Sequence, residues 1–249
     1  MEELDRFEDE LIGRYAQHPV LADIAGLPDE DFAAVLLQRR FLSLAFTPAY
    51  DLAIDLLRDE EGLRIARVIL REEYPDSRGM RSHREDMTAD MYRLGVSREA
   101  LVHTRPTPAT RRAIDATFDL IADAGTREDS DLRVLTILRF WGEILVSVEY
   151  GRLWERMEPL LVQDGENVSR FYYPHHQHDA KSESLATADL LAVTHADRLA
   201  TRVRAYLGTG GERAADSFRE TEERSLAIKV GFYDQFLPAL ERVGTRTGG

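Results

Sequence analysis

A long apolar stretch from Asp131 to Met157 contains a carboxylate near its middle, in the run F-W-G-E-I-L-V. Leucine, isoleucine, valine and aromatic residues recur along it at helical spacing, which predicts one long, buried helix. Glu143 stands among them, and a carboxylate on a buried face carries a large desolvation penalty unless it is paired or bound to a metal. Two interpretations are open. Glu143 is a metal ligand, or the helix is rotated so that Glu143 lies at the surface with Arg139 as its partner.

The rest of the 249-residue chain has the same helical character. Helical spacing of apolar residues predicts helices over residues 4–15, 29–59 with an interruption at Pro48, 61–74, 82–94 ended by Gly95, 109–124, 184–207 and 212–243. No segment shows a convincing strand pattern, and there is no internal repeat. The expected fold class is therefore all-α, in one domain over residues 1–249, with a frayed tail at residues 244–249.

Composition excludes several kinds of chemistry. The chain has no Cys, which rules out disulfides, zinc–thiolate sites, iron–sulfur clusters and cysteine nucleophiles. A formal net charge of −13, with no basic stripe, argues against a nucleic-acid partner. The acidic N-terminus lacks the pattern of a signal peptide, and no apolar stretch approaches about 18 residues. We therefore expect a cytoplasmic protein without a membrane partner.

Imidazoles and carboxylates gather where predicted helices begin or end. Three of the seven His lie in the run Y-P-H-H-Q-H-D, which ends in Asp179. If the helix that follows extends back to residue 175, then His175, Asp179 and Ser182 share one face, because 3.6 residues per turn stacks positions i, i+4 and i+7. His176 with Asp179 and Glu183 gives a second register on the same helix.

A second polar pair flanks a predicted turn. Glu73 ends the helix before the turn P-D-S-R-G, and His83 lies in the first turn of the next helix, so the turn could fold the two together. With Glu143, His175 and Asp179 they form a set of oxygen and nitrogen donors from four helical segments. Such a set suits non-heme iron or manganese in a helical bundle, and zinc is chemically compatible as well. Taken singly, Glu73 and His83 are each better explained as surface groups.

The sequence resembles the heme-oxygenase-like diiron oxidases and oxygenases, often labelled iron-containing redox enzymes. The run E-E-Y-P-D-S-R-G-M-R-S-H is similar to the family's Glu-Tyr-Gly turn with a His ten residues after the Glu. The run F-Y-Y-P-H-H-Q-H-D-A-K-S-E is similar to its Phe-Tyr, His and Asp pattern, and the order and spacing agree from about residue 15 to about residue 240. The resemblance implies a heme-oxygenase-like up-and-down bundle of about seven helices. It also implies a set of metal ligands: Glu73, His83, Glu143, His175 and Asp179.

The chain departs from the family at the last ligand. The family's final His would fall at Ser182, and Pro75 replaces the Gly that usually follows Glu-Tyr. Three consequences are open. His178, one turn back, takes the place of the missing ligand; or water fills the place and a single metal remains; or the centre is lost and the scaffold does something else.

The resemblance implies Fe(II), as two ions or one, with O₂ as cosubstrate. Family members are N-oxygenases, desaturases and carbon–carbon bond-cleaving oxidases, so the expected substrate is a small organic molecule of specialised metabolism, such as an amino acid, an amine or a fatty acid. Glu143 and Glu73 would be the catalytic carboxylates: Glu143 would bridge the metals or balance their charge, and Glu73 or Asp179 would change its coordination to admit O₂.

Two other functions stay open. One is a metal-free, degenerate helical scaffold that binds a small molecule or a protein partner. The other is the thiaminase-like hydrolase branch of the fold, whose members use a Cys that this chain lacks. True heme oxygenase is disfavoured because His18, next to Pro19, is the one N-terminal His available. An electron donor and a homodimer are compatible with the oxidase.

Further residues are candidates around the site. Those that could hold the ligating imidazoles are Tyr172, Tyr173, Asp86 and Arg81, and those that could bind a substrate carboxylate are Arg39, Arg40, Arg78, Arg81 and Lys229.

Overall fold

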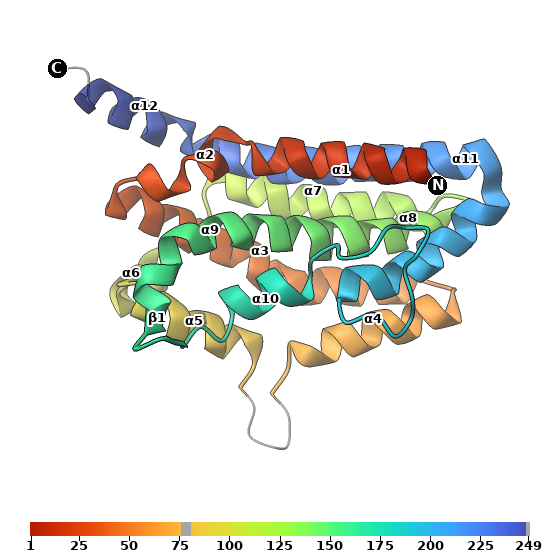
Figure 1. Ribbon diagram of the computed structural model, residues 1–249, viewed down its shortest axis with the longest axis horizontal. Helices are drawn as coiled ribbons and strands as arrows, with labels where there is room; N and C mark the ends of the chain where they lie inside the picture. Colours follow the sequence, from red (N-terminus) through yellow and green to blue (C-terminus); the bar gives the residue numbers. More distant parts are fainter. Residues whose placement is uncertain (76–80, 248–249) are drawn as a thin grey trace.

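The computed structural model describes residues 1–75 and 81–247, and it describes side chains as far as residue 242. These residues form an all-α bundle (Figure 1). Its α-helices are α1 (Glu2–Ala16), α2 (Pro19–Ala22), α3 (Asp29–Leu56), α4 (Glu60–Glu72), α5 (His83–Arg93), α6 (Arg98–His103), α7 (Pro108–Gly125), α8 (Ser130–Ile137), α9 (Leu145–Leu161), α10 (Tyr172–His178), α11 (His195–Tyr233) and α12 (Leu237–Thr247). Two short 3-10 turns, η1 (Ile24–Gly26) and η3 (Asp234–Phe236), and one π-helix, η2 (Leu138–Ile144), complete the helical part.

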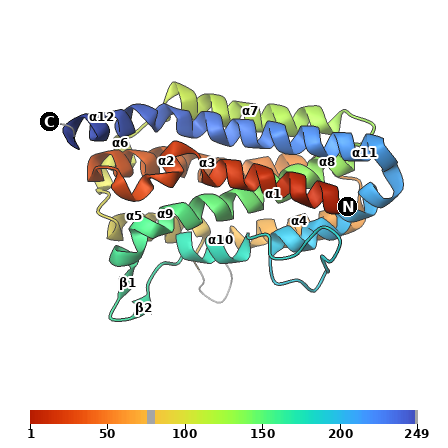
Figure 2. The ribbon, with the colours of Figure 1, turned by 45° about the horizontal axis from the view of Figure 1, so that its top comes forward.

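The long helices lie side by side, and the short α10 packs against α9 (Figures 1 and 2). Helix α11 packs against α8, η2, α7 and α1, while α3 packs against α7. All seven residues of η2 are buried, so the π-helix lies at the centre of the bundle. None of the described helices is apolar over a length that could cross a bilayer.

The predicted helix over 131–157 is present as the continuous run α8, η2 and α9, which extends to Leu161. Gly95 ends α5 with φ 85°, as expected of a helix C-cap. The predicted interruption at Pro48 is wrong. Helix α3 continues through this proline, because residues on both sides, such as Leu42, Ala49 and Tyr50, are buried in the bundle and hold the helix together.

The region after α9 differs most from expectation. A two-stranded hairpin, β1 (Val162–Gln163) and β2 (Glu166–Asn167), follows α9, although the sequence shows no strand pattern. The helix predicted over 184–207 begins only at His195, and the residues before it form turns. Helix α11 then kinks at Gly211, where φ is 59°, close to the predicted break. The predicted fraying of residues 244–249 stays a prediction, since residues 248–249 lie outside the described part of the chain.

Candidate metal centre

Six imidazole and carboxylate side chains gather in two groups of three. Each residue of a group offers one ligand atom, and within a group these atoms lie within 4.8 Å of one another. The first group is Glu73, His83 and His175, and the second group is Glu143, Asp179 and His195. All six residues line one cleft of about 950 Å³. The structure therefore brings together the five residues predicted from the sequence and adds a sixth.

The first pair of ligands is held where two helices meet. Glu73 directly follows α4, and His83 is the first residue of α5, where Ser82 and Glu85 form a reciprocal capping box. The cap fixes the start of α5, and Nδ1 of His83 lies 2.8 Å from the Glu73 carboxylate. The turn predicted to fold these residues together includes residues 76–79, which lie outside the described part of the chain.

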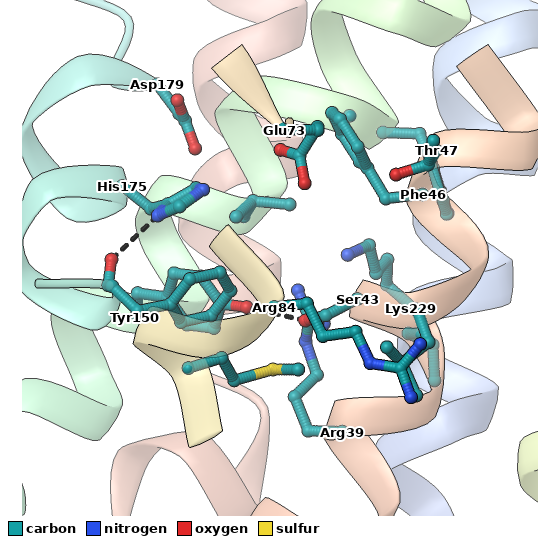
Figure 3. Close-up of a pocket in the computed structure, with 17 residues that line it drawn as sticks. Arg39, Ser43, Phe46, Thr47, Glu73, Arg84, Tyr150, His175, Asp179 and Lys229 are labelled. Atoms are coloured by element: carbon teal, nitrogen blue, oxygen red, sulfur yellow. Dashed lines mark hydrogen bonds between the residues drawn. The ribbon is translucent and has the colours of Figure 1, made fainter. Parts of the chain in front are cut away.

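His175 is held by its own helix and by a buried carboxylate. Asp90 is fully buried and accepts hydrogen bonds from the hydroxyl of Ser169 (2.8 Å) and the backbone N–H of Phe171 (2.9 Å), which fixes the start of α10. Nδ1 of His175 donates to the carbonyl oxygen of Phe171 at 2.7 Å, so Nε2 is left for a metal. The ring lies 4.6 Å from the ring of His83 (Figure 3 shows His175 beside Glu73 and Asp179).

Glu143 lies inside the π-helix with 1% of its surface exposed. A π-helix within a longer α-helix frequently marks a functional site. The phenol of Tyr50 donates a short hydrogen bond to Glu143, and Asp179, 3% exposed, lies close to it across the cleft. The alternative with Glu143 at the surface is therefore wrong, and Arg139 instead pairs with Glu8 inside the bundle.

His195 completes the second group and was not predicted from the sequence. It is the first residue of α11, whose N-cap is Thr194, and it is 7% exposed. Its Nδ1 lies 3.3 Å from Glu143 and 3.5 Å from Asp179, while Nε2 lies 3.3 Å from Glu72. Nδ1 is thus the nitrogen that a metal in this group would use. The available signal was the run T-H-A-D, a cap residue followed by an acid three positions later.

Ser182 belongs to neither group. Helix α10 ends at His178, so the face shared by positions 175, 179 and 182 does not exist at Ser182. The Ser182 hydroxyl donates a short hydrogen bond to Asp197 instead, and its backbone N–H lies 3.3 Å from the same carboxylate. The third residue of the second group therefore comes from α11, at His195, rather than from α10.

The substitutes considered for Ser182 are also outside the two groups. His178 is exposed and lines the cleft, with its ring 6.4 Å from that of His195. His176 turns the other way, towards α9, where its Nδ1 lies 3.1 Å from the carbonyl oxygen of Ser147. Glu183 is exposed, so the second register is not formed.

The electrostatics of the site favour a bound cation. Burial, and then the nearby charge of Glu143, raise the pKa of Asp179 well above its ordinary value. Burial alone would lower the pKa of His195, but Asp179, Glu143 and Glu72 raise it to about 12. The protonated ring of His195 is thus a positive partner of two buried carboxylates, and a metal ion on Nδ1 would take over this role by displacing the proton.

The donor set fits iron. Three imidazoles and three carboxylates, with no thiolate in the chain, suit Fe(II) or Mn(II) better than a structural zinc. Burial, and then the charge of His83, hold the pKa of His175 well below its ordinary value, so this ring is available in the neutral form that binds metals.

A second, inner cavity of about 250 Å³ adjoins the cleft (Figure 3). Four residues line both spaces: Phe46, Glu73, His175 and Asp179. The candidate ligands therefore stand between an outer cleft and an inner chamber.

The groups that hold the ligands differ from those nominated. Tyr50, Glu72 and the Phe171 carbonyl contact the ligands, whereas Tyr172 packs on Tyr150. Of the other residues predicted around the site, Tyr173 packs on Trp154, and Asp86 and Arg81 line the cleft. Arg39 and Lys229 line the inner cavity, whereas Arg40 donates to the carbonyl oxygen of Leu101. Arg78 lies outside the described residues.

His18 takes a structural role. Its Nδ1 accepts from the backbone N–H of Val20 at 3.3 Å, and its Nε2 lies 3.1 Å from Asp234. Both nitrogens therefore have protein partners at the start of α2.

No protein family profile matches the chain, and no curated protein sequence matches it. Solved structures do. A CADD-like protein of unknown function from Nostoc punctiforme is 14% identical with a TM-score of 0.66, covering 98% of this chain and 100% of that one. A domain of unknown function with a heme oxygenase-like fold from Shewanella denitrificans is 15% identical with a TM-score of 0.68, covering 96% and 93%. A TenA homolog from Pseudomonas syringae pv. tomato is 13% identical with a TM-score of 0.67, covering 95% and 92%. These likenesses show that the chain has a heme-oxygenase-like fold.

Proposed function

We propose that this protein is a non-heme iron enzyme that uses O₂ to oxidise a small organic molecule. The observation that carries the proposal is the convergence of six imidazole and carboxylate side chains on one cleft, from η2 and from the ends of α4, α5, α10 and α11. Two groups of three ligands correspond to two metal positions, with His195 as the sixth ligand in place of the residue expected at Ser182.

Iron bound at these positions would supply the activation of O₂. The surrounding residues of the chain orient the ligands. The Phe171 carbonyl fixes the tautomer of His175, and Glu72 binds Nε2 of His195 so that Nδ1 faces the second group. The Tyr50 hydroxyl restrains Glu143 by a hydrogen bond. The inner cavity, lined in part by aromatic and aliphatic side chains, would hold the substrate beside Glu73 and Asp179.

His195 weakens the argument for a metal-free scaffold, since that argument rested on the loss of a ligand at Ser182. The likeness to TenA proteins concerns the fold, and a thiaminase-like hydrolase would lack its Cys nucleophile in this chain. An electron donor and a homodimer remain predictions.

An anaerobic Fe(II) titration of metal-free protein tests the proposal. We expect two ions per chain for the wild type and one for His195→Ala. His178→Ala is the matched control, because His178 lies in the same cleft outside both groups, and it should still bind two. Equal iron content in His195→Ala and the wild type would refute the ligand assignment.

A wild type that binds no iron would refute the proposed function itself. If iron binds, O₂ uptake should then be screened with amino acids, amines and fatty acids. Substrate-dependent uptake that is lost in Glu143→Ala is the expected result.

A further inference from the structure

The inner cavity is lined by three cationic side chains as well as by metal ligands. Lys229 and Arg39 are buried, with exposed fractions of 1% and 3%, while Arg84 is exposed. The Lys229 amine points into the chamber below Glu73, and Arg39 approaches it from α3 (Figure 3). Buried lysine and arginine are rare unless they are paired.

The two buried cations share one carboxylate. Glu149, itself fully buried, accepts a short hydrogen bond from Nε of Arg39 and lies 3.3 Å from Nζ of Lys229. Tyr233 donates a third, short hydrogen bond to Glu149. Among the residues that the structure describes, Glu149 is the one carboxylate within ion-pair distance of either cation. When Arg39 and Lys229 are both charged, the cluster of Arg39, Lys229 and Glu149 therefore has a net charge of +1.

The remaining contacts of the two cations do not neutralise this charge. Arg39 donates to the hydroxyl of Ser43 at 2.7 Å, and the Lys229 amine stands 5.1 Å from the centre of the Trp141 ring. Burial lowers the pKa of Lys229 to about 8; Glu149, on α9, and Asp179, on the metal side, oppose this effect, while Arg39 adds to it. An anion in the cavity would satisfy the amine.

The other wall of the cavity is apolar. It is formed by Leu42, Leu44, Phe46, Met87, Trp141, Val146 and Phe171. The rings of Phe46 and Trp141 are nearly parallel, at 16° with centres 6.4 Å apart. A volume of about 250 Å³ lies just below the range of about 300–1,000 Å³ usual for small-molecule sites, so the occupant is small.

We propose that the inner cavity binds a small carboxylic acid with an apolar body, whose carboxylate is held by Lys229 with support from Arg39. Its apolar part fills the space between Phe46, Trp141 and Met87. Because Glu73, His175 and Asp179 line the same cavity, a molecule anchored at Lys229 also lies beside the candidate metal ligands. This inference rests on the proposed function where it makes the acid the substrate, but the binding site stands on the cavity alone.

Lys229 is well suited to a direct test because only two of the 32 basic residues, Lys181 and Lys229, are lysines. Lys181 lies elsewhere, in ion pairs with Glu8 (2.8 Å) and Asp9 (2.6 Å). Lys181→Met is therefore a matched control for Lys229→Met, with the same chemical change outside the cavity.

The probe is 3-phenylpropanoate, with 3-phenylpropanol and 3-phenylpropylamine as controls of the same shape without the negative charge. The chain has two Trp, and Trp154→Phe leaves Trp141, in the cavity wall, as the one indole reporter. Fluorescence titration should show saturable binding of the acid and weaker binding of the alcohol and the amine. Lys229→Met should lose about 10- to 100-fold in affinity for the acid, the effect of losing a hydrogen bond to a charged group, and little for the alcohol. Lys181→Met should leave both affinities unchanged.

Thermal unfolding separates binding from folding. If Lys229 serves to bind an anion rather than to stabilise the fold, Lys229→Met removes an unneutralised buried charge. The melting temperature of this variant should then equal or exceed that of the wild type. A melting temperature lowered by several degrees, with unchanged preference for acid over alcohol, would assign Lys229 a structural role and overturn the proposal. Failure of all three probes to bind the wild type would overturn it as well.

The titration is run with and without Fe(II), so that the two proposals fail separately. Binding of the acid by a chain that takes up no iron would support the carboxylate site and refute the oxidase. Uptake of two iron ions without preference for the acid would support the metal centre and refute the carboxylate site.

Discussion

Replacing Glu149 by Gln should strongly destabilise the fold. Glu149 is the common acceptor of Arg39, Lys229 and Tyr233 in a buried position. The amide keeps the shape and one accepting oxygen but removes the negative charge, so both cations face a neutral group. Arg39 cannot release its proton, whereas Lys229 can, which limits the loss.

The expected size follows from the burial of the pair. Removing one partner of a buried ion pair costs about 3–5 kcal/mol, and because Gln retains one accepting oxygen we expect a loss of about 3 kcal/mol for Glu149→Gln. For a chain of this length each 1 kcal/mol shifts the melting temperature by about 2–4 °C, which gives a decrease of about 6–12 °C.

The assay is thermal unfolding followed by far-UV circular dichroism at pH 7. Glu155→Gln is the control, because Glu155 lies on the same helix in an exposed ion pair with Arg152, 2.9 Å apart. Its loss should change stability by about 1 kcal/mol or less. Equal melting temperatures for the two variants would show that the charge of Glu149 does not stabilise the fold and would refute the reasoning.

Two further outcomes are expected. In Gly151→Ala the new methyl would lie 2.8 Å from a ring carbon of His176, so this ring must leave its contact with the Ser147 carbonyl oxygen on α9. Because this contact helps to hold α10, Fe(II) binding should weaken by about tenfold or more in the titration. Gly231→Ala, with no atom within 4 Å of the new methyl, should leave iron binding unchanged, and equal affinities of the two variants would contradict the role of the His176 contact. The pKa of Lys229 is lowered to about 8 in the folded protein, so the unfolded chain alone holds this proton between about pH 8 and the ordinary pKa of 10.5. The free energy of unfolding of the wild type should therefore rise with pH across this range by up to about 3 kcal/mol relative to that of Lys229→Met. Urea unfolding at several pH values measures this difference. Parallel pH profiles for the wild type and Lys229→Met would contradict the prediction.

The buried Glu143 could be predicted because its neighbours in sequence are also its neighbours in the core. Residues 138–144 are apolar almost throughout, and the structure buries all of them. Glu73, His83, His175 and Asp179 could be nominated from the resemblance, which carries the family's spacing.

His195 could not be found in this way, because the segment before it imitates a helix. Leu190, Leu191 and Val193 were expected within the helix over 184–207, yet their exposed fractions are 47%, 92% and 83%. Two buried carboxylates hold this segment in its turns instead: Asp5 accepts from the backbone N–H of Leu185 at 2.7 Å, and Asp197 accepts from the residues around position 182. Such contacts join positions far apart in the chain, so they cannot be predicted from the residues on either side.

The inner cavity was equally inaccessible to sequence reasoning. Arg39 and Lys229 were two of several nominated cations, and only the packing of α3, α9 and α11 shows that they meet at Glu149. The excess of positive charge arises because Arg39 and Lys229 share Glu149, and it could not be predicted from either cation alone.

The π-helix has a consequence for how this chain can vary in length. Each backbone hydrogen bond of a π-helix spans one residue more than in the α-helix around it, so deleting one residue between 138 and 144 would restore a regular helix without breaking the bundle. Helices α8 and α9 would keep the directions they face, because the wide turn accommodates the residue that is removed, but the side chains within residues 138–144 would change their directions around the helix. Arg139, which pairs with Glu8, and Glu143, which contacts Tyr50, could no longer both face their partners. A relative shorter by one residue at this point should therefore keep the fold and lose the second ligand group.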